Sequence, residues 1–175
     1  MQVRPTSDRL RETLFNVIAP RIQEARFLDL CAGSGAIGIE ALSRDAAHVT
    51  FVDRSRKMCA LIKSNLELCR VAETASKIVQ SEAGDFLAVS VKRNQEPWDI
   101  VFFDPPYADD YLPVLESLGL QSENLLVEGG VLIVEHDKRK GLPEQVGMLH
   151  RNRILKQGDS ALSFYEIGSR ASRPQ

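Results

Sequence analysis

The 175 residues carry a formal net charge of −2, from 22 Lys and Arg residues against 24 Asp and Glu residues. This length, with 43% hydrophobic residues, suits one globular domain with a sizeable core. The charge excludes an overall basic nucleic-acid-binding protein, so any such surface must be local. No apolar run approaches the roughly 18 residues of a membrane span, and no signal-peptide core follows Met1. We therefore expect a cytoplasmic protein with no membrane partner.

Cysteine and histidine residues indicate neither a disulfide framework nor a metal site. The three Cys residues form no C-x-x-C pair, and an odd number argues against disulfides. We expect reduced thiols that are buried or partly buried. The His residues are scattered without ligand spacing, so no metal is predicted. The residues concerned are Cys31, Cys59, Cys69, His48, His136 and His150.

Helical and strand patterns alternate along the chain. The first pattern is a helix with apolar residues on one face, capped within residues 6–8 and ended by Pro20. Apolar runs then predict strands at residues 27–30, 49–52, 77–80, 98–103 and 131–134. The intervening helices are expected at residues 36–43, 58–70 and 86–91, with helical turns within 109–127.

This alternation predicts an α/β fold, a doubly wound parallel sheet covered on both faces. The end of the chain differs, because the runs 153–156 and 161–167 flank Gln-Gly-Asp-Ser at 157–160, a composition typical of a hairpin turn. We expect a single domain over residues 1–168, with 169–175 as a frayed, disordered tail.

A glycine loop follows the first strand, with glycines at 33, 35 and 38 in the pattern G-x-G-x-x-G. These glycines allow a tight turn and a close approach of the backbone to a ligand at a helix N-terminus. Asp53 ends the second strand about 20 residues further on, where an acid can accept both hydroxyls of a ribose. The loop therefore predicts a nucleoside ligand, and by itself fits NAD and S-adenosylmethionine equally.

Two further acids favour S-adenosylmethionine. Asp29 precedes the loop, where a carboxylate suits an ammonium group and would repel a pyrophosphate. After the third strand, an acid can accept from the adenine amine, and we favour Glu82 over Asp85 because it is nearer the strand end. The cofactor-binding residues expected are Asp29, Ala32, Gly33, Ser34, Gly35, Asp53, Glu82 and Ala83.

The fourth strand ends in Asp104, Pro105, Pro106 and Tyr107. The carboxylate can accept from an N–H, the prolines fix the backbone, and the ring offers a stacking face. Such a clamp fits a flat ring that carries an amine. Because the lone pair of an aromatic amine is delocalised, Asp104 and the carbonyl of Pro105 would have to hold both N–H bonds and turn the lone pair toward a methyl group.

Taken together, four stretches resemble one family. Residues 4–16, 29–44, 104–107 and 157–165 are similar to the bacterial small-subunit ribosomal RNA guanine-N2 methyltransferases of the RsmD type, class I enzymes that use S-adenosylmethionine. The first and last stretches are specific to the family. The resemblance implies a Rossmann-like, mostly parallel sheet of seven strands with an antiparallel C-terminal hairpin edge. It also implies methylation of one guanine N2 in 16S rRNA, within a 30S assembly particle.

RNA contacts are expected from Arg4, Arg9 and Arg11, although Arg11 equally suits a pair with a nearby acid. A second basic run lies at residues 138–140. Relatives usually begin with a basic, glycine-rich segment, and this chain starts almost at the Arg-Pro-Thr stretch, which bears on RNA affinity more than on chemistry. We expect a monomer, because the substrate would itself be a large particle.

Other functions remain open from the sequence. Adenine-N6 methylation of DNA or RNA would use the same clamp, whereas protein glutamine methyltransferases usually have Asn in place of Asp104. An NAD-dependent oxidoreductase would account for the glycine loop but not for residues 104–107. A non-catalytic RNA-binding assembly factor that keeps the cofactor fold would have the same sequence features.

Overall fold

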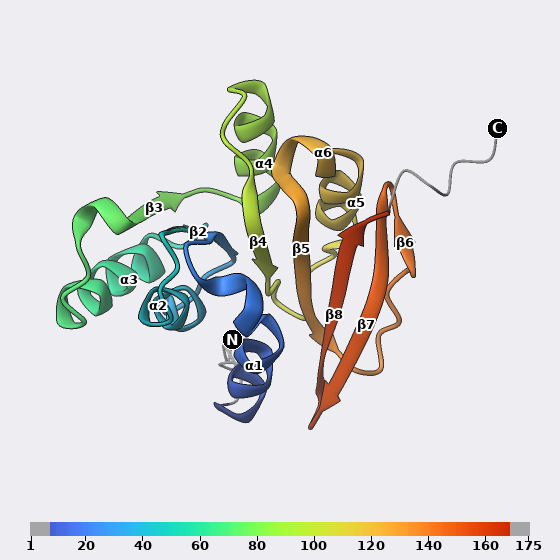
Figure 1. The fold of residues 1–175 in the computed structure, drawn as a ribbon, viewed down its shortest axis with the longest axis horizontal. Coiled ribbons are helices and arrows are strands. Elements are labelled where there is room, and N and C mark those ends of the chain that lie inside the picture. Colours follow the sequence, from blue (N-terminus) through green and yellow to red (C-terminus); the bar gives the residue numbers. More distant parts are fainter. Residues whose placement is uncertain (1–7, 169–175) are drawn as a thin grey trace.

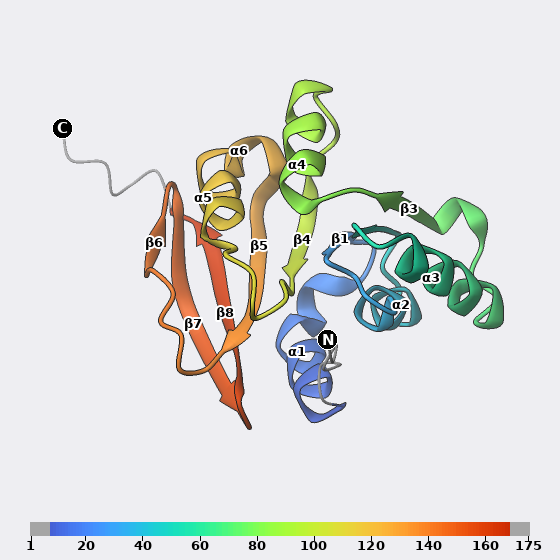
Figure 2. The ribbon, with the colours of Figure 1, turned by 180° about the vertical axis from the view of Figure 1, so that it is seen from behind.

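The computed structural model describes residues 8–168, so Arg4 and the expected tail at 169–175 lie outside the described residues. One eight-stranded sheet runs through the molecule in the order β3-β2-β1-β4-β5-β8-β7-β6 (Figures 1 and 2). The first elements are α1 (Asp8–Ile22), β1 (Arg26–Leu30), α2 (Ala36–Ser43), β2 (His48–Asp53), α3 (Arg56–Leu68), η1 (Glu73–Ala75) and β3 (Ser76–Gln80). They are followed by α4 (Ala83–Lys92), β4 (Trp98–Phe103), α5 (Leu112–Leu120), α6 (Ser122–Leu125), β5 (Leu126–Asp137), β6 (Gln145–Val146), β7 (Leu149–Gln157) and β8 (Ser160–Ile167).

Strands β1 to β5 are parallel, and the central strands β1, β2, β4 and β5 have side chains buried on both faces of the sheet, whereas the edge strand β3 has no buried residue. One core cluster packs α1, α2 and α3 on one face, and a second packs α4, α5 and α6 on the other (Figures 1 and 2). Two-sided burial explains why these central strands are continuous apolar runs, and confirms the predicted doubly wound arrangement.

The antiparallel edge of the sheet was predicted correctly, but the number of strands in the sheet was not. Strand β8 pairs with β5 and β7 in antiparallel directions, and Gln157 and Ser160 face each other at the expected hairpin turn. The sheet has eight strands rather than seven, because Gln145 and Val146 form the short strand β6 against β7. A strand of two residues carries no alternating pattern, so the sequence contains no signal for it.

The first helix does not end at Pro20 as predicted, but continues to Ile22. A proline in the last turn removes one backbone donor, whereas the residues beyond it gain contacts. Ile22 is buried in the core, and Arg21 donates to the carbonyl of Gly129 at 2.8 Å and pairs with Glu166. Tertiary contacts therefore extend the helix by two residues.

The cysteines are free thiols, as expected. Cys31 and Cys59 are partly buried, but the expectation is wrong for Cys69, which is exposed. It occupies the C-cap of α3, past the last buried residue of that helix, Leu66. Within residues 8–168, no helix has the length and apolar character needed to cross a membrane.

Candidate active site

The order of the strands reverses at β1, which lies between β2 and β4. In doubly wound sheets, ligands bind at the carboxyl ends of the strands at such a switch point. The carboxyl ends of β4 and β5, the β7–β8 turn and the start of α1 lie at the same edge (Figure 1). We call the ends of β1, β2 and β3 the cofactor half of the site. The ends of β4 and β5 with the β7–β8 turn are its acceptor half.

The glycine loop has the backbone conformation that its composition predicts. Gly33 and Gly35 have φ angles of 56° and 80°, in the left-handed region. A Cβ at Gly33 would meet no atom within 4 Å, so open space lies beside the loop. Backbone bonds fix the turn: Ala32 donates to the carbonyl of Val52 at 3.0 Å, and Gly35 donates to that of Ala32 at 2.8 Å.

Gly38 has a different role from the two glycines before it. A Cβ there would lie 2.3 Å from Cε1 of Phe51 and 2.8 Å from Cγ1 of Val49. The third glycine of the pattern therefore lets α2 pack closely on β2. Ser34, between the first two, offers its carbonyl to the side chain of Asn65 at 2.9 Å, which ties the loop to α3.

Asp53 organises the loop through both of its carboxylate oxygens. Oδ2 accepts from the backbone N–H of Gly33 at 2.9 Å, and Oδ1 accepts from that of Ser55 at 2.8 Å. The acid thus lies beside the glycine loop, where the sequence placed it. Since each carboxylate oxygen has two lone pairs, these bonds leave room for hydroxyl donors.

Asp29 is almost completely buried, with an exposed fraction of 1%. It is therefore less accessible than the prediction of a contact with an ammonium group implies. Its Oδ2 accepts from the backbone N–H of Gly38 at 3.0 Å and so joins β1 to the start of α2. Burial is the main cause that raises the pKa of Asp29 to about 8, with a smaller contribution from the charge of Asp53. A cation bound nearby would favour its ionised form.

The third strand leads into α4, whose N-cap is Glu82 and whose first residue is the buried Ala83. The Glu82 side chain is exposed and lies 3.9 Å from the guanidinium of Arg54. Asp85 lies in the first turn of α4 and is also exposed. Of these two acids, Glu82 lies nearer the end of β3. Arg54 also pairs with Asp109, in the loop after β4, at 3.4 Å.

The loop after β4 begins beside the glycine loop. The backbone N–H of Asp104 donates to the carbonyl of Leu30 at 3.3 Å, which joins the acceptor half to the end of β1. Burial is the largest cause that raises the pKa of Asp104 well above its usual value, followed by the charges of Glu135 and Asp29. Pro105 is buried and Pro106 is exposed.

Tyr107 follows with its ring 41% exposed. Its hydroxyl lies 2.7 Å from Oγ of Ser160, which opens β8. Burial raises the pKa of Tyr107, the bond from Ser160 lowers it, and the charges of Glu135 and Asp104 raise it. An aromatic face is thus available at the mouth of the acceptor half.

Glu135 is a candidate site residue that the sequence reasoning missed. It is 4% exposed and follows Val134, which pairs with Phe103, so it is the neighbour of Asp104 across parallel strands. The signal was present, because an acid directly after the predicted fifth strand follows the same rule that identified Asp104 after the fourth.

Of the three arginines predicted to bind RNA, Arg9 and Arg11 lie within the described residues. Arg9 is exposed on α1, and Arg11 pairs with Asp8 at 3.0 Å, the alternative considered for it. In the second basic run, Lys138 pairs with Asp159 at 3.6 Å and Arg139 pairs with Asp137 at 2.6 Å.

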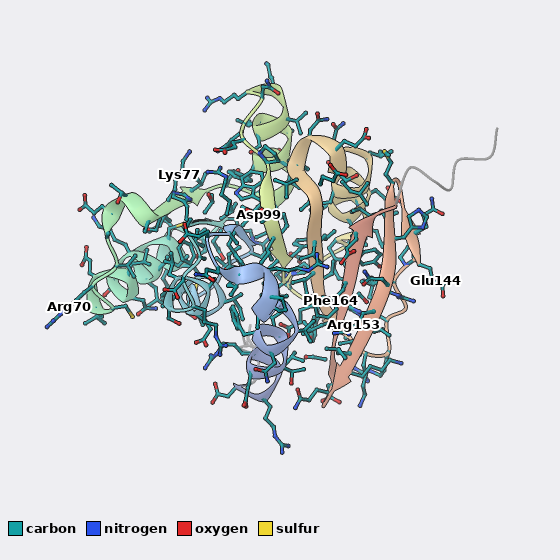
Figure 3. All side chains as sticks on the ribbon, viewed as in Figure 1. Arg70, Lys77, Asp99, Glu144, Arg153 and Phe164 are labelled. Atoms are coloured by element: carbon teal, nitrogen blue, oxygen red, sulfur yellow. The ribbon has the colours of Figure 1, made fainter. Side chains whose placement is uncertain are left out.

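The third residue of that run, Lys140, lies 4.1 Å from the ring centre of Tyr111. All three basic side chains of this run therefore contact other residues of the protein. Charged side chains elsewhere are scattered over the outside, with Arg70 and Glu144 at opposite ends of the molecule (Figure 3).

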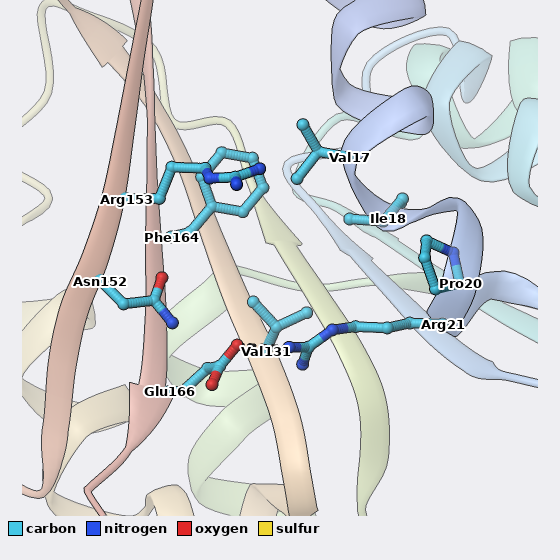
Figure 4. A pocket seen from close by; sticks show the side chains of 9 residues that line it. All are labelled: Val17, Ile18, Pro20, Arg21, Val131, Asn152, Arg153, Phe164 and Glu166. Atoms are coloured by element: carbon cyan, nitrogen blue, oxygen red, sulfur yellow. Dashed lines mark hydrogen bonds and ion pairs between the residues drawn. The ribbon is translucent and has the colours of Figure 1, made fainter.

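A cavity of about 420 Å³ lies apart from these residues, between the end of α1 and strands β7 and β8. The ion pair of Arg21 and Glu166 crosses it at 2.5 Å, with Asn152 near Glu166 and Arg153 beside the ring of Phe164 (Figure 4). None of the residues predicted for the cofactor or the amine lines this cavity. It therefore contributes no group to the site at the strand ends.

Comparisons with known proteins agree with this geometry. Residues 1–166 match the family described as Conserved hypothetical protein 95. The chain is 39% identical to Ribosomal RNA small subunit methyltransferase D of Escherichia coli over 158 residues, which are 89% of this chain and 76% of that protein. It is 38% identical to YlbH of Bacillus subtilis over 163 residues, 93% of this chain and 87% of that protein.

The fold also matches a solved structure. The structure of yhhF from Escherichia coli superposes with a TM-score of 0.80 at 36% identity, covering 95% of this chain and 88% of that one. The similarity extends across the glycine loop, the loop after β4 and the antiparallel edge, since nearly the whole chain is covered.

Proposed function

Because the chain belongs to the Conserved hypothetical protein 95 family, we propose that it transfers a methyl group from S-adenosylmethionine to the N2 amine of one guanine in 16S ribosomal RNA. Relatives named Ribosomal RNA small subunit methyltransferase D, at 37–39% identity, support an rRNA methyltransferase. The observation that carries the reaction type is the bond from Asp104 to Leu30. This bond joins the end of β4, where we propose the amine clamp, to the end of β1, where the glycine loop begins.

The residues of the cofactor half fit S-adenosylmethionine. Open space borders Gly33, and Asp53 faces the loop, where it would accept the ribose hydroxyls. Asp29 would balance the ammonium group of the cofactor, and Glu82 would accept from the adenine amine beside Ala83. When bound, the cofactor supplies a sulfonium methyl group that is already a good electrophile.

In the acceptor half, Asp104 and the carbonyl of Pro105 would each accept one N–H of the guanine amine. This arrangement would direct the nitrogen lone pair out of the ring plane and toward the sulfonium methyl group, so that a C–N bond could form as the methyl–sulfur bond breaks with its electrons passing to sulfur. The nitrogen then carries a positive charge and gives up a proton. Asp104 would receive it, and its raised pKa would make it a better acceptor than an exposed aspartate.

The target base has to leave its stack in folded RNA before it can enter the site, at a cost of a few kcal/mol. The exposed ring of Tyr107 would offset part of that cost by stacking on the guanine. Exposed Arg9, on the helix whose start borders the same edge, would contact phosphates. We propose a 30S particle as the substrate and a monomer as the active form.

Adenine-N6 methylation is not favoured, because relatives at 37–39% identity are named small-subunit ribosomal RNA methyltransferase D. Mass spectrometry of 16S rRNA from cells with and without this gene tests the proposal. One guanine should lose a methyl group when the gene is deleted, and regain it when the wild-type gene returns but not when Asp104→Ala returns. Unchanged rRNA methylation in the deletion strain would contradict the proposal.

A further inference from the structure

The β7–β8 turn reaches the loop after β4, although the two are 53 residues apart in sequence. The contact is the 2.7 Å hydrogen bond between the hydroxyls of Tyr107 and Ser160. Ser160 is the first residue of β8, where it pairs with Asp137 of β5 and Gln157 of β7. Its backbone is therefore held by strands on both sides.

Two further contacts fix the turn itself. The side-chain oxygen of Gln157 lies 3.4 Å from the hydroxyl of Thr13 on α1, whose single proton also has the carbonyl of Arg9 as a nearer acceptor at 2.9 Å. The ammonium group of Lys138, which follows β5, donates to the carbonyl of Gly158 at 2.6 Å. Gly158 has a φ of 59°, the left-handed conformation that favours glycine in a tight turn. The turn thus contacts α1 and is anchored to the end of β5.

Tyr107 needs such an anchor because its own loop gives the ring little support. The side chain is 41% exposed, and Pro106 before it and Ala108 after it are exposed as well. A ring attached only through its Cβ can rotate about two side-chain bonds. A hydrogen bond at the far end of the ring removes that freedom.

We propose that Ser160 is a positioning residue that holds the ring of Tyr107 in the orientation needed to stack on the target guanine. The β7–β8 turn is then a wall of the substrate site. This inference rests on the proposed function, in which Tyr107 stacks on the base. It gives a role to the Gln-Gly-Asp-Ser stretch, which the cofactor and the amine clamp leave without one.

Removal of the Tyr107 hydroxyl distinguishes a positioning role of Ser160 from stacking by the ring alone. A phenylalanine ring would stack equally well, but could not bond to Ser160. If Ser160 acts through that bond, then Tyr107→Phe and Ser160→Ala remove the same interaction. Their effects should therefore overlap when they are combined.

Steady-state kinetics on 30S particles that lack the methyl group, with labelled S-adenosylmethionine, tests this coupling. We expect Ser160→Ala to lower kcat/KM for the particle about threefold to tenfold, the loss expected for one hydrogen bond. The loss should appear as a higher KM for the particle, because stacking is made in the bound state as well as in the transition state. The dissociation constant for S-adenosylmethionine, measured by calorimetry, should not change.

Four further variants complete the test. Ser160→Thr keeps the hydroxyl and should restore most of the lost kcat/KM, and Ser64→Ala, on the exposed face of α3, is the matched control with no loss. Tyr107→Phe should match Ser160→Ala, and the double variant should be no worse than either one. Wild-type kinetics for Ser160→Ala, or additive losses in the double variant, would overturn the inference. Failure of the proposed function would be distinct, because the wild-type protein would then methylate no guanine.

Discussion

The two halves of the candidate active site differ in what surrounds their carboxylates. In the cofactor half, Asp29 and Asp53 accept backbone N–H groups at 2.8–3.0 Å, which hold both carboxylates in place, although burial still raises the pKa of Asp29 to about 8. In the acceptor half, burial and two neighbouring acids, Glu135 and Asp29, disfavour the charge on Asp104. The cofactor half is therefore organised before any ligand binds. The acceptor half holds an acid whose charge a substrate donor would stabilise.

This difference predicts that the two halves can be disabled separately. Asp104→Ala should leave the affinity for S-adenosylmethionine unchanged, and should lower methyl transfer about 100-fold to 1,000-fold, the loss typical of one preorganised hydrogen-bonding group. Calorimetry measures the first quantity, and a labelled-methyl assay on unmodified 30S particles measures the second. Glu116→Ala, which removes an exposed acid from α5, is the control for both. Near-normal turnover of Asp104→Ala would rule out the proposed role.

The packing beneath the cofactor half is expected to matter for stability more than for chemistry. In Gly38→Ala the new Cβ would lie 2.3 Å from the ring of Phe51, and we expect a loss of about 1–3 kcal/mol in the free energy of unfolding. Gly84→Ala is the matched variant, because its Cβ would lie 3.9 Å from Val114, an ordinary contact. Urea unfolding of both variants checks this, and equal stabilities would show that Gly38 is not a packing residue.

Asp53 connects the glycine loop to the proposed ribose site. Its removal should therefore weaken cofactor binding and leave the acceptor half unchanged. Asp53→Ala loses the acceptor for Gly33 and Ser55, and we expect the affinity for S-adenosylmethionine to fall about tenfold or more. Titration calorimetry measures this, with Glu67→Ala on the exposed face of α3 as the control. An unchanged affinity would mean that the loop binds no ribose.

The acceptor half should respond to pH through Glu135. The negative charge of this neighbour is one cause that raises the pKa of Asp104, after burial, so Glu135→Gln should lower that pKa. The ionised carboxylate then persists to lower pH, and the acid limb of the profile of kcat/KM against pH should shift to lower pH. Glu128→Gln, an exposed position in the same strand, should leave the profile in place. A shift to higher pH would contradict the assigned cause.

The sequence predicts the cofactor half better than the acceptor half for a physical reason. Gly33 and Gly35 act through local backbone geometry, and Asp53 lies at the spacing from them that the nucleotide-binding pattern of such sheets prescribes. The contact of Tyr107 with Ser160 depends on how β8 pairs with β5, which no local pattern encodes. For the same reason, strand β6 was missed, although the strand ends that carry Asp104 were found.

Gly38 and the end of α1 also show that local sequence patterns do not predict contacts between elements. The glycine pattern predicted a ligand loop, whereas the packing role of Gly38 depends on Phe51 of the next strand. Pro20 was expected to end α1, but the buried Ile22 extends it. In each case, contacts between elements decide what the local sequence leaves open.

Identification of the methylated nucleoside tests the central claim most directly. The purified protein would be incubated with labelled S-adenosylmethionine and 30S particles that lack the modification, and the 16S rRNA would then be digested to nucleosides. The label should appear in N2-methylguanosine with the wild-type protein and be absent with Asp104→Ala. Label in N6-methyladenosine, or an equal yield of N2-methylguanosine from both proteins, would contradict the account.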